Sequence, residues 1–225
     1  MKIRKQMKPN KPFKIGLALV ACSFAAASSN AATMITILNH SFEDATNTSW
    51  QIESNGSTAI KTTSGVIASA AHDTPPDGSD TINHSNGQSS HQAYQVLGAT
   101  LTANTTYTLT VDVGDRTDLD PGGPVLRLGT GTTYGANLLA GTVVSDTTPV
   151  NGAGASDGWE TWITTFTTGA TPTGLGDALR VELRNDATTQ ALFDNVRLDA
   201  SPVPEPSTTA LLGLGGLALI LRRRK

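Results

Sequence analysis

The segment Tyr107-Thr108-Leu109-Thr110-Val111-Asp112-Val113 alternates apolar and polar side chains along its whole length. Successive side chains of an extended strand point to opposite faces, so this alternation predicts a half-buried antiparallel strand. Residues 178–184 repeat the pattern, with the leucines and valine expected inward and the charges outward. Shorter segments suited to strands are found at 35–42, 50–53, 66–68, 94–97, 125–128, 138–144, 159–167 and 192–199.

The breaks between these segments are rich in Gly, Asp, Asn and Pro, the residues that turns require. Outside the two ends of the chain, no amphipathic helix of ten or more residues is predicted. We therefore expect an all-β fold, a two-sheet antiparallel sandwich of the jelly-roll type. An N-terminal signal helix and a short C-terminal hydrophobic helix should flank it.

The first 31 residues resemble a secretory signal peptide. Six basic residues up to Lys14 precede an apolar run at 15–27, which at about 13 residues is too short to span a bilayer. Ser29-Asn30-Ala31 offers the small-x-small pattern that signal peptidase cleaves, so the mature chain should begin near Ala32. Alternatively, the segment ending at Cys22 resembles a lipobox, which would make a lipidated cysteine the mature amino terminus.

The carboxyl end has three parts in order: a Pro-Glu-Pro triplet, an apolar segment at about 210–221 and a basic tail at 222–225. It resembles the PEP-CTERM sorting signal of Gram-negative bacteria. The resemblance implies passage through the secretion translocon, transient anchoring in the inner membrane, and cleavage by an exosortase that delivers the protein to the cell surface or extracellular matrix. The residues concerned are Pro204, Glu205, Pro206, Arg222, Arg223 and Arg224.

The apolar segment of this tail would extend only about 18 Å as a helix, against a hydrocarbon core of roughly 30 Å. It is therefore a marginal anchor, and the basic tail should stay cytoplasmic. An ordinary single-pass tail anchor is the alternative. Between these ends, residues 32–201 are expected to form one domain, with residues 202–225 as the sorting signal.

The formal charge of −3 conceals a much more acidic domain. Residues 32–201 contain eighteen acidic and six basic side chains, a formal charge of −12. Such a domain should repel nucleic acid and anionic lipid, but it is compatible with divalent cations and neutral polysaccharide. The chain's one cysteine lies in the signal segment, which excludes disulfides and thiol catalysis in the mature protein.

Two further motifs, Asn39-His40-Ser41-Phe42-Glu43 and Phe193-Asp194-Asn195-Val196-Arg197-Leu198, resemble the first and last strands of carbohydrate-binding-module-like, or galactose-binding-like, jelly rolls. Many such domains hold a structural calcium between these strands, and the resemblance implies Glu43 and Asp194 as its ligands. In the alternative interpretation, Glu43 caps a loop and Asp194 accepts strand-edge amides.

Other polar residues give no recognisable catalytic arrangement. The acidic run Asp112, Asp115, Asp118 and Asp120 departs from EF-hand spacing, and a solvated turn or a loose cation site explains it. The four histidines, His40, His72, His84 and His91, show no metal-binding spacing. We therefore predict no catalytic residue and no enzyme, with a glycan-active hydrolase as a distant alternative because acidic residues are plentiful.

Sugar recognition uses aromatic side chains that stack on pyranose faces, and burial in the core is the alternative role of each aromatic residue. Trp159 and Trp162 lie three apart in one predicted strand and should face opposite sides. The candidates are Trp50, Tyr94, Tyr134, Trp159 and Trp162. The sequence thus predicts an exported surface or biofilm-matrix protein that binds or organises exopolysaccharide, with a purely structural matrix component as the alternative.

Overall fold

The computed structural model describes residues 31–44, 49–53, 58–62, 74–84, 91–114, 123–145, 158–186 and 191–204, together with Gly216 and Arg222. Residues Ser29–Pro206 form one compact unit. Both predicted terminal helices fall almost entirely outside the described residues. In the part of the chain that the structure describes, no helix has the length and hydrophobicity to span a membrane.

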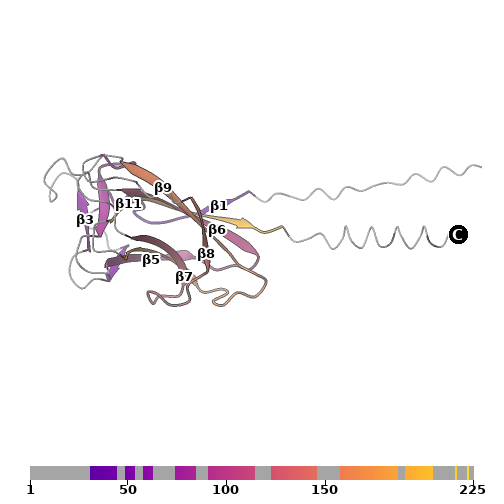
Figure 1. The fold of residues 1–225 in the computed structure, drawn as a ribbon. Helices are drawn as coiled ribbons and strands as arrows, with labels where there is room; N and C mark the ends of the chain where they lie inside the picture. Colours follow the sequence, from indigo (N-terminus) through magenta and orange to yellow (C-terminus); the bar gives the residue numbers. More distant parts are fainter. Residues whose placement is uncertain are drawn as a thin grey trace, which may run out of the picture. The chain divides into compact units, whose positions relative to one another are not determined.

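The predicted β-sandwich is confirmed. Among the described residues, the larger sheet has seven strands in the order β3-β4-β11-β6-β9-β8, with β1 also paired to β11, and the smaller has the order β2-β5-β10-β7. The sheets lie face to face, with β6, β9 and β11 in one layer and β5 and β7 in the other (Figure 1). The strands are β1 (Thr33–Ile35), β2 (Gln51–Glu53), β3 (Thr58–Thr62), β4 (Asp80–His84), β5 (His91–Thr100), β6 (Thr105–Gly114), β7 (Pro124–Thr130), β8 (Gly141–Ser145), β9 (Trp159–Thr167), β10 (Ala178–Asn185) and β11 (Ala191–Pro202).

The core lies between the two sheets and follows the predicted alternation. Strand β6 contributes Tyr107, Leu109, Val111 and Val113, all at most 1% exposed. The leucines and valine of β10 meet them from the smaller sheet. Alternate residues of both strands consequently form the outer faces of the sandwich.

Three details differ from the predicted strands. The first strand ends at Ile35 because the chain turns at Asn39 (φ 48°) and Phe42 (φ 60°), which are not extended conformations. Strands β3 and β4 were not predicted, while the predicted strand at 66–68 lies outside the described residues. The charges of β10 point outward as expected, but Arg180 and Glu182 are both 0% exposed.

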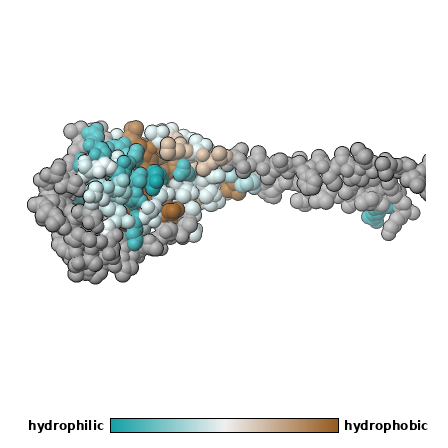
Figure 2. Space-filling model, turned by 90° about the horizontal axis from the view of Figure 1, so that it is seen from above, coloured by the Kyte–Doolittle hydropathy of each residue, from teal (hydrophilic) through white to brown (hydrophobic). Residues whose placement is uncertain are grey.

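The surface seen from above the larger sheet is mainly hydrophilic or intermediate in hydropathy, with small separate hydrophobic areas (Figure 2). Among the described residues, the most exposed large apolar side chains are Met34 at 73% and Leu38 at 58%.

Candidate functional site

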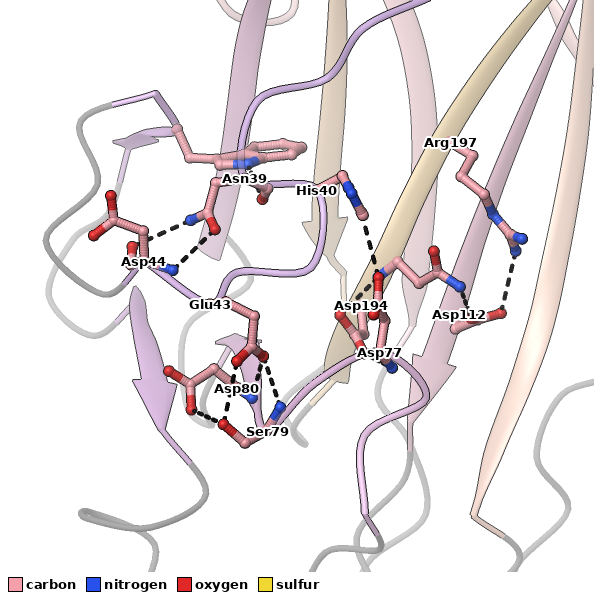
Figure 3. Close-up of polar contacts among 12 residues, drawn as sticks. Asn39, His40, Glu43, Asp44, Asp77, Ser79, Asp80, Asp112, Asp194 and Arg197 are labelled. Atoms are coloured by element: carbon pink, nitrogen blue, oxygen red, sulfur yellow. Dashed lines mark hydrogen bonds and ion pairs between the residues drawn. The ribbon is translucent and has the colours of Figure 1, made fainter. Parts of the chain in front are cut away.

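Glu43 holds the segment before β4 through its carboxylate. The backbone N–H groups of Ser79 and Asp80 both donate to Glu43 Oε1 at 2.7 Å, and the Ser79 hydroxyl donates to Oε2 at 3.2 Å (Figure 3). Gly78 makes this approach feasible, because a Cβ there would lie 2.2 Å from Glu43 Oε1 and its φ is +84°. Burial and the Glu43 charge together raise the pKa of the neighbouring Asp80.

Asp194 holds the same segment from β11. Its side chain is 0% exposed, and it accepts the N–H of Asp77 on Oδ2 at 3.0 Å and the N–H of Asn195 on Oδ1 at 2.7 Å. The second contact arises at a β-bulge, where Asn195 has φ 49°. Burial, reinforced by the charges of Asp77 and Asp112, raises the pKa of Asp194 to about 7 although the two amides oppose the shift.

These contacts correspond to the interpretation in which Glu43 caps a loop and Asp194 accepts amides. The two carboxylates hold different parts of the segment 77–80 rather than converging on one point (Figure 3). Among the described residues, no group of three or more His, Cys, Asp or Glu side chains is placed to hold a metal ion. The arrangement does not fit a shared calcium, whose binding stays a prediction. A rise in melting temperature on adding calcium to EDTA-treated protein would establish it.

Of the acidic run, the structure describes Asp112 alone. Asp112 accepts the Thr161 hydroxyl at 2.6 Å and the Asn195 amide at 2.8 Å, and lies 3.8 Å from the Arg197 guanidinium. Asp112 therefore links three strands on the outer face of the larger sheet. Asp115, Asp118 and Asp120 lie outside the described residues.

The two histidine side chains that the structure describes have different neighbours. His40 lies 3.6 Å from Asp77, with both side chains about half exposed (Figure 3). His84 is buried edge-on against Phe193, with ring centroids 5.0 Å apart. His72 and the side chain of His91 lie outside the described residues.

The predicted aromatic candidates divide between the core and the surface. Trp50 is 4% exposed and donates its indole N–H to Asn39 O, and Tyr94 is 5% exposed. Trp162 packs against the core, whereas Trp159, three residues earlier in β9, lies over Gly114 on the outer face. Trp159, Trp162 and Tyr134 are all half-buried, and of these three Trp162 is the one that packs against the core.

Sequence reasoning missed a polar cluster on the outer face of the smaller sheet. Arg180 donates from Nε to Glu182 Oε1 at 2.7 Å, and its remaining nitrogens donate to backbone carbonyls of the segment that covers it. These carbonyls belong to Thr130, Gly131 and Ala136, at 2.7, 2.8 and 2.6 Å. Residues 131–139 therefore lie across β10, and they account for the complete burial of the pair.

Three polar atoms in the described part of this cluster are buried without hydrogen-bond partners: Thr130 Oγ1, Glu182 Oε2 and the Tyr134 hydroxyl. Glu182 Oε1 accepts the N–H of Gly135 at 2.8 Å in addition to Arg180, but Oε2 has no partner. The Tyr134 hydroxyl is likewise buried and without a hydrogen bond of acceptable geometry. Burial, followed by the Glu182 charge, raises the pKa of Tyr134, and the guanidinium groups of Arg127 and Arg184 oppose that rise.

Tyr134 and Tyr94 form the aromatic part of the same cluster. Their ring centroids are 5.7 Å apart with the planes tilted by 49°. Tyr94 lies opposite Glu182, which in turn lies opposite Arg127. The sequence contained one signal of this site, the glycine at position 129. A Cβ on Gly129 would lie 2.6 Å from Arg180 Nη2, so the glycine leaves the space that the guanidinium fills.

Two family models match this chain. A family model described as HpiC1 cyclase matches residues 33–199. The chain belongs to the HpiC1-like family. A second model, the PEP-CTERM protein-sorting motif, matches residues 202–225 and confirms the sorting signal. In that signal, Pro204 and Arg222 are described and exposed, and the other predicted sorting residues lie outside the described set.

Solved structures similar to this HpiC1-like chain include enzymes and binding modules. The cyclase Fisc from Fischerella sp. TAU, bound to an indole compound, is 24% identical with TM-score 0.58, covering 76% of this chain and 99% of its own. A second cyclase structure from that organism is 23% identical with TM-score 0.60 (78% and 100%). The CBM22-1 xylan-binding domain of Paenibacillus barcinonensis Xyn10C is 13% identical with TM-score 0.50 (78% and 99%). No curated protein matches the chain.

These neighbours establish the fold and leave open whether the protein is an enzyme. The PEP-CTERM motif establishes an exported protein sorted to the cell surface. The polysaccharide role and the absence of catalysis therefore stay predictions.

Proposed function

We propose that this protein is a non-enzymatic surface protein that binds glycan through the outer face of its smaller sheet. The proposal is carried by the half-buried Tyr134 ring, which lies in the segment that covers the Arg180–Glu182 pair and whose neighbour Glu182 has an unpartnered Oε2. Carboxylate oxygens accept sugar hydroxyls, and aromatic rings stack on the apolar faces of pyranoses. Leaving a buried acceptor unpaired is costly, so such an atom in a polar cluster favours a ligand as its missing partner.

The PEP-CTERM sorting signal supports a cell-surface location for this function. An exosortase would release the protein from a transient position in the inner membrane to the outer surface of a Gram-negative cell, where it would meet exopolysaccharide. The xylan-binding neighbour supports a glycan ligand on this fold, at the level of the fold alone. A matrix component without sugar binding is the competing function.

A glycan array probed with the full-length protein tests the proposal. We expect binding to a restricted set of glycans, weakened at least about tenfold in Tyr134→Ala and in Glu182→Gln. Leu138→Ala is a matched control, because Leu138 lies in the same covering segment and is 41% exposed. A flat array together with self-association of the protein would contradict the proposal and favour the purely structural function.

Catalysis of a cyclisation reaction is a second candidate function. Membership of the HpiC1-like family and the raised pKa of Asp194 favour it. The Asp194 pKa of about 7 would suit proton transfer near neutral pH. Against this role, Asp194 is 0% exposed and both its oxygens already accept backbone amides. A Fischerella cyclase was solved with 4-(1H-indol-3-yl)butan-2-one, so calorimetric titration of that compound is the direct test. Saturable binding that Asp194→Asn abolishes would favour this candidate, and the absence of heat would remove it.

A further inference from the structure

Three of the six basic residues between positions 32 and 201 lie on the outer face of the smaller sheet. Arg127 belongs to β7, and Arg180 and Arg184 belong to β10. A core leucine precedes each of them, so their side chains point away from the other sheet. Half of the basic side chains of a domain with a formal charge of −12 are thus gathered on one face.

The ion pairs of this face leave one guanidinium over. Arg180 is bonded to Glu182 at 2.7 Å, and Arg184 forms an ion pair with Asp186. In the described part of the chain, the Arg127 guanidinium has neither an ion pair nor a hydrogen bond. The domain has three acidic residues for each basic one, so an arginine without a carboxylate partner leaves a place for an anion from outside.

The arginines of this face differ in their access to solvent. Arg127 is partly exposed, and the Arg184 side chain is 28% exposed. Arg180, by contrast, is 0% exposed beneath residues 131–139. A guanidinium has five N–H donors, so one ion pair does not use all those of Arg184. Arg127 and Arg184 are therefore the two arginines of this face that a ligand can reach.

Both reachable arginines lie close to the ring that carries the proposed function. The N–H of Gly135 is bonded to Glu182 Oε1 at 2.8 Å, so the adjacent Tyr134 lies close to that carboxylate. Glu182 lies opposite Arg127 in the pairing of β10 with β7. The charges of Arg127 and Arg184 are near enough to Tyr134 to oppose the rise in its pKa. A half-buried aromatic ring and two reachable guanidinium groups thus share one site.

We infer that the glycan bound at Tyr134 is acidic, and that Arg127, with Arg184 beside it, binds its carboxylate groups. The inference rests on the proposed function and names the ligand class of the same site. A uronic acid carries its carboxylate at the edge of the pyranose ring, so a sugar stacked on Tyr134 leaves that group free to meet a guanidinium beside the aromatic ring. Guanidinium binds carboxylate through paired N–H donors, which suits arginine to such a ligand.

The net negative charge of the domain does not prevent this binding. Charges separated by more than a Debye length, about 8 Å at physiological ionic strength, are largely screened. The groups beside the ligand therefore decide the interaction. The three arginines are matched by two described acidic side chains, Glu182 and Asp186, which leaves one positive charge in excess on this face.

Calorimetric titrations of the full-length protein with acidic hexasaccharides and their carboxyl-reduced forms test this inference. The acidic compounds are the hexamers of galacturonate, mannuronate and hyaluronan. Reduction of each carboxylate to an alcohol removes the charge and keeps the sugar rings. We expect at least one acidic compound to bind about tenfold more tightly than its reduced form. Added salt should weaken binding of the acidic compound and leave that of the reduced form unchanged, because screening acts on ion pairs.

Arg127→Gln should remove the preference for the acidic compound. Its affinity for that compound should fall about tenfold, with unchanged affinity for the reduced form. Arg127→Lys is the second variant should the glutamine variant fail to fold, and it should lose a smaller factor because it keeps the charge without the paired donors. Arg197→Gln is the matched control, because Arg197 is on the larger sheet, has a side chain 44% exposed and loses the same charge. It should bind both compounds as the unmodified protein does.

The outcomes separate this inference from the proposed function. Equal affinities for an acidic compound and its reduced form, both weakened in Tyr134→Ala, would overturn the acidic ligand and leave the proposed glycan site intact. A preference for the acidic compound that is unchanged in Arg127→Gln would overturn the role of Arg127. Binding of none of the compounds would overturn the inference, and a positive glycan array would then support the proposed function alone.

Discussion

Each sheet contains a fully buried carboxylate, and the two carboxylates have different partners. Glu182 of β10 has a guanidinium 2.7 Å away, whereas Asp194 of β11 has two backbone amides and two neighbouring acids but no cation bonded to it. The cost of burying a carboxylate without a counter-ion appears as its raised pKa. The comparison shows that one buried carboxylate of this sandwich is bonded to a cation, whereas the other, bonded to amides, has a raised pKa.

The largest expected effect comes from removing the cation of the first pair. Arg180→Met should destabilise the protein by about 5 kcal/mol, because it leaves the Glu182 carboxylate buried without its cation and the carbonyls of Thr130, Gly131 and Ala136 without donors. Urea denaturation measures the change. The double variant Arg180→Met with Glu182→Leu should recover most of the loss, and a double variant as unstable as the single one would show that the charge is not the cause.

The second expected effect is a pH dependence that originates in Asp194. Its pKa is about 7 in the folded protein against an ordinary value of 3.8, so the folded state holds a proton that the unfolded state has released between these values. The contribution of Asp194 to the free energy of unfolding therefore falls as pH rises from about 4 to 7, by about 4 kcal/mol in total. Denaturation midpoints across this range measure it. Asp194→Asn should flatten the slope, and an equal slope in both proteins would refute the assignment.

A smaller effect is expected where Glu43 approaches the backbone. Gly78→Ala should cost about 3 kcal/mol, because alanine is strained at φ +84° and its Cβ would overlap the Glu43 carboxylate. Gly98→Ala is a control, since nothing lies within 4 Å of a Cβ there. Thermal unfolding measures the melting temperature of both variants. An equal loss of melting temperature in the two would show that the Glu43 contact does not require glycine at position 78.

Strands were predicted from the sequence where one face is buried and the other is exposed to solvent, as in Tyr107 to Val113. It failed for β4, all five residues of which are buried, so that Asp80, Asn83 and His84 lack the expected alternation. The roles of Glu43 and Asp194 as loop and amide partners were among the predicted alternatives. The burial of Glu182 was not predictable from periodicity, because residues 131–139 from another part of the chain produce it.

The most direct test of the central claim is calorimetric titration of xylohexaose, and of the best glycan from the array, into full-length protein and its Tyr134→Ala variant. We expect saturable binding to the unmodified protein and at least a tenfold weaker response of the site on the smaller sheet in the variant. Identical titration curves for the two proteins, or no binding by either, would contradict glycan recognition at Tyr134 and Glu182.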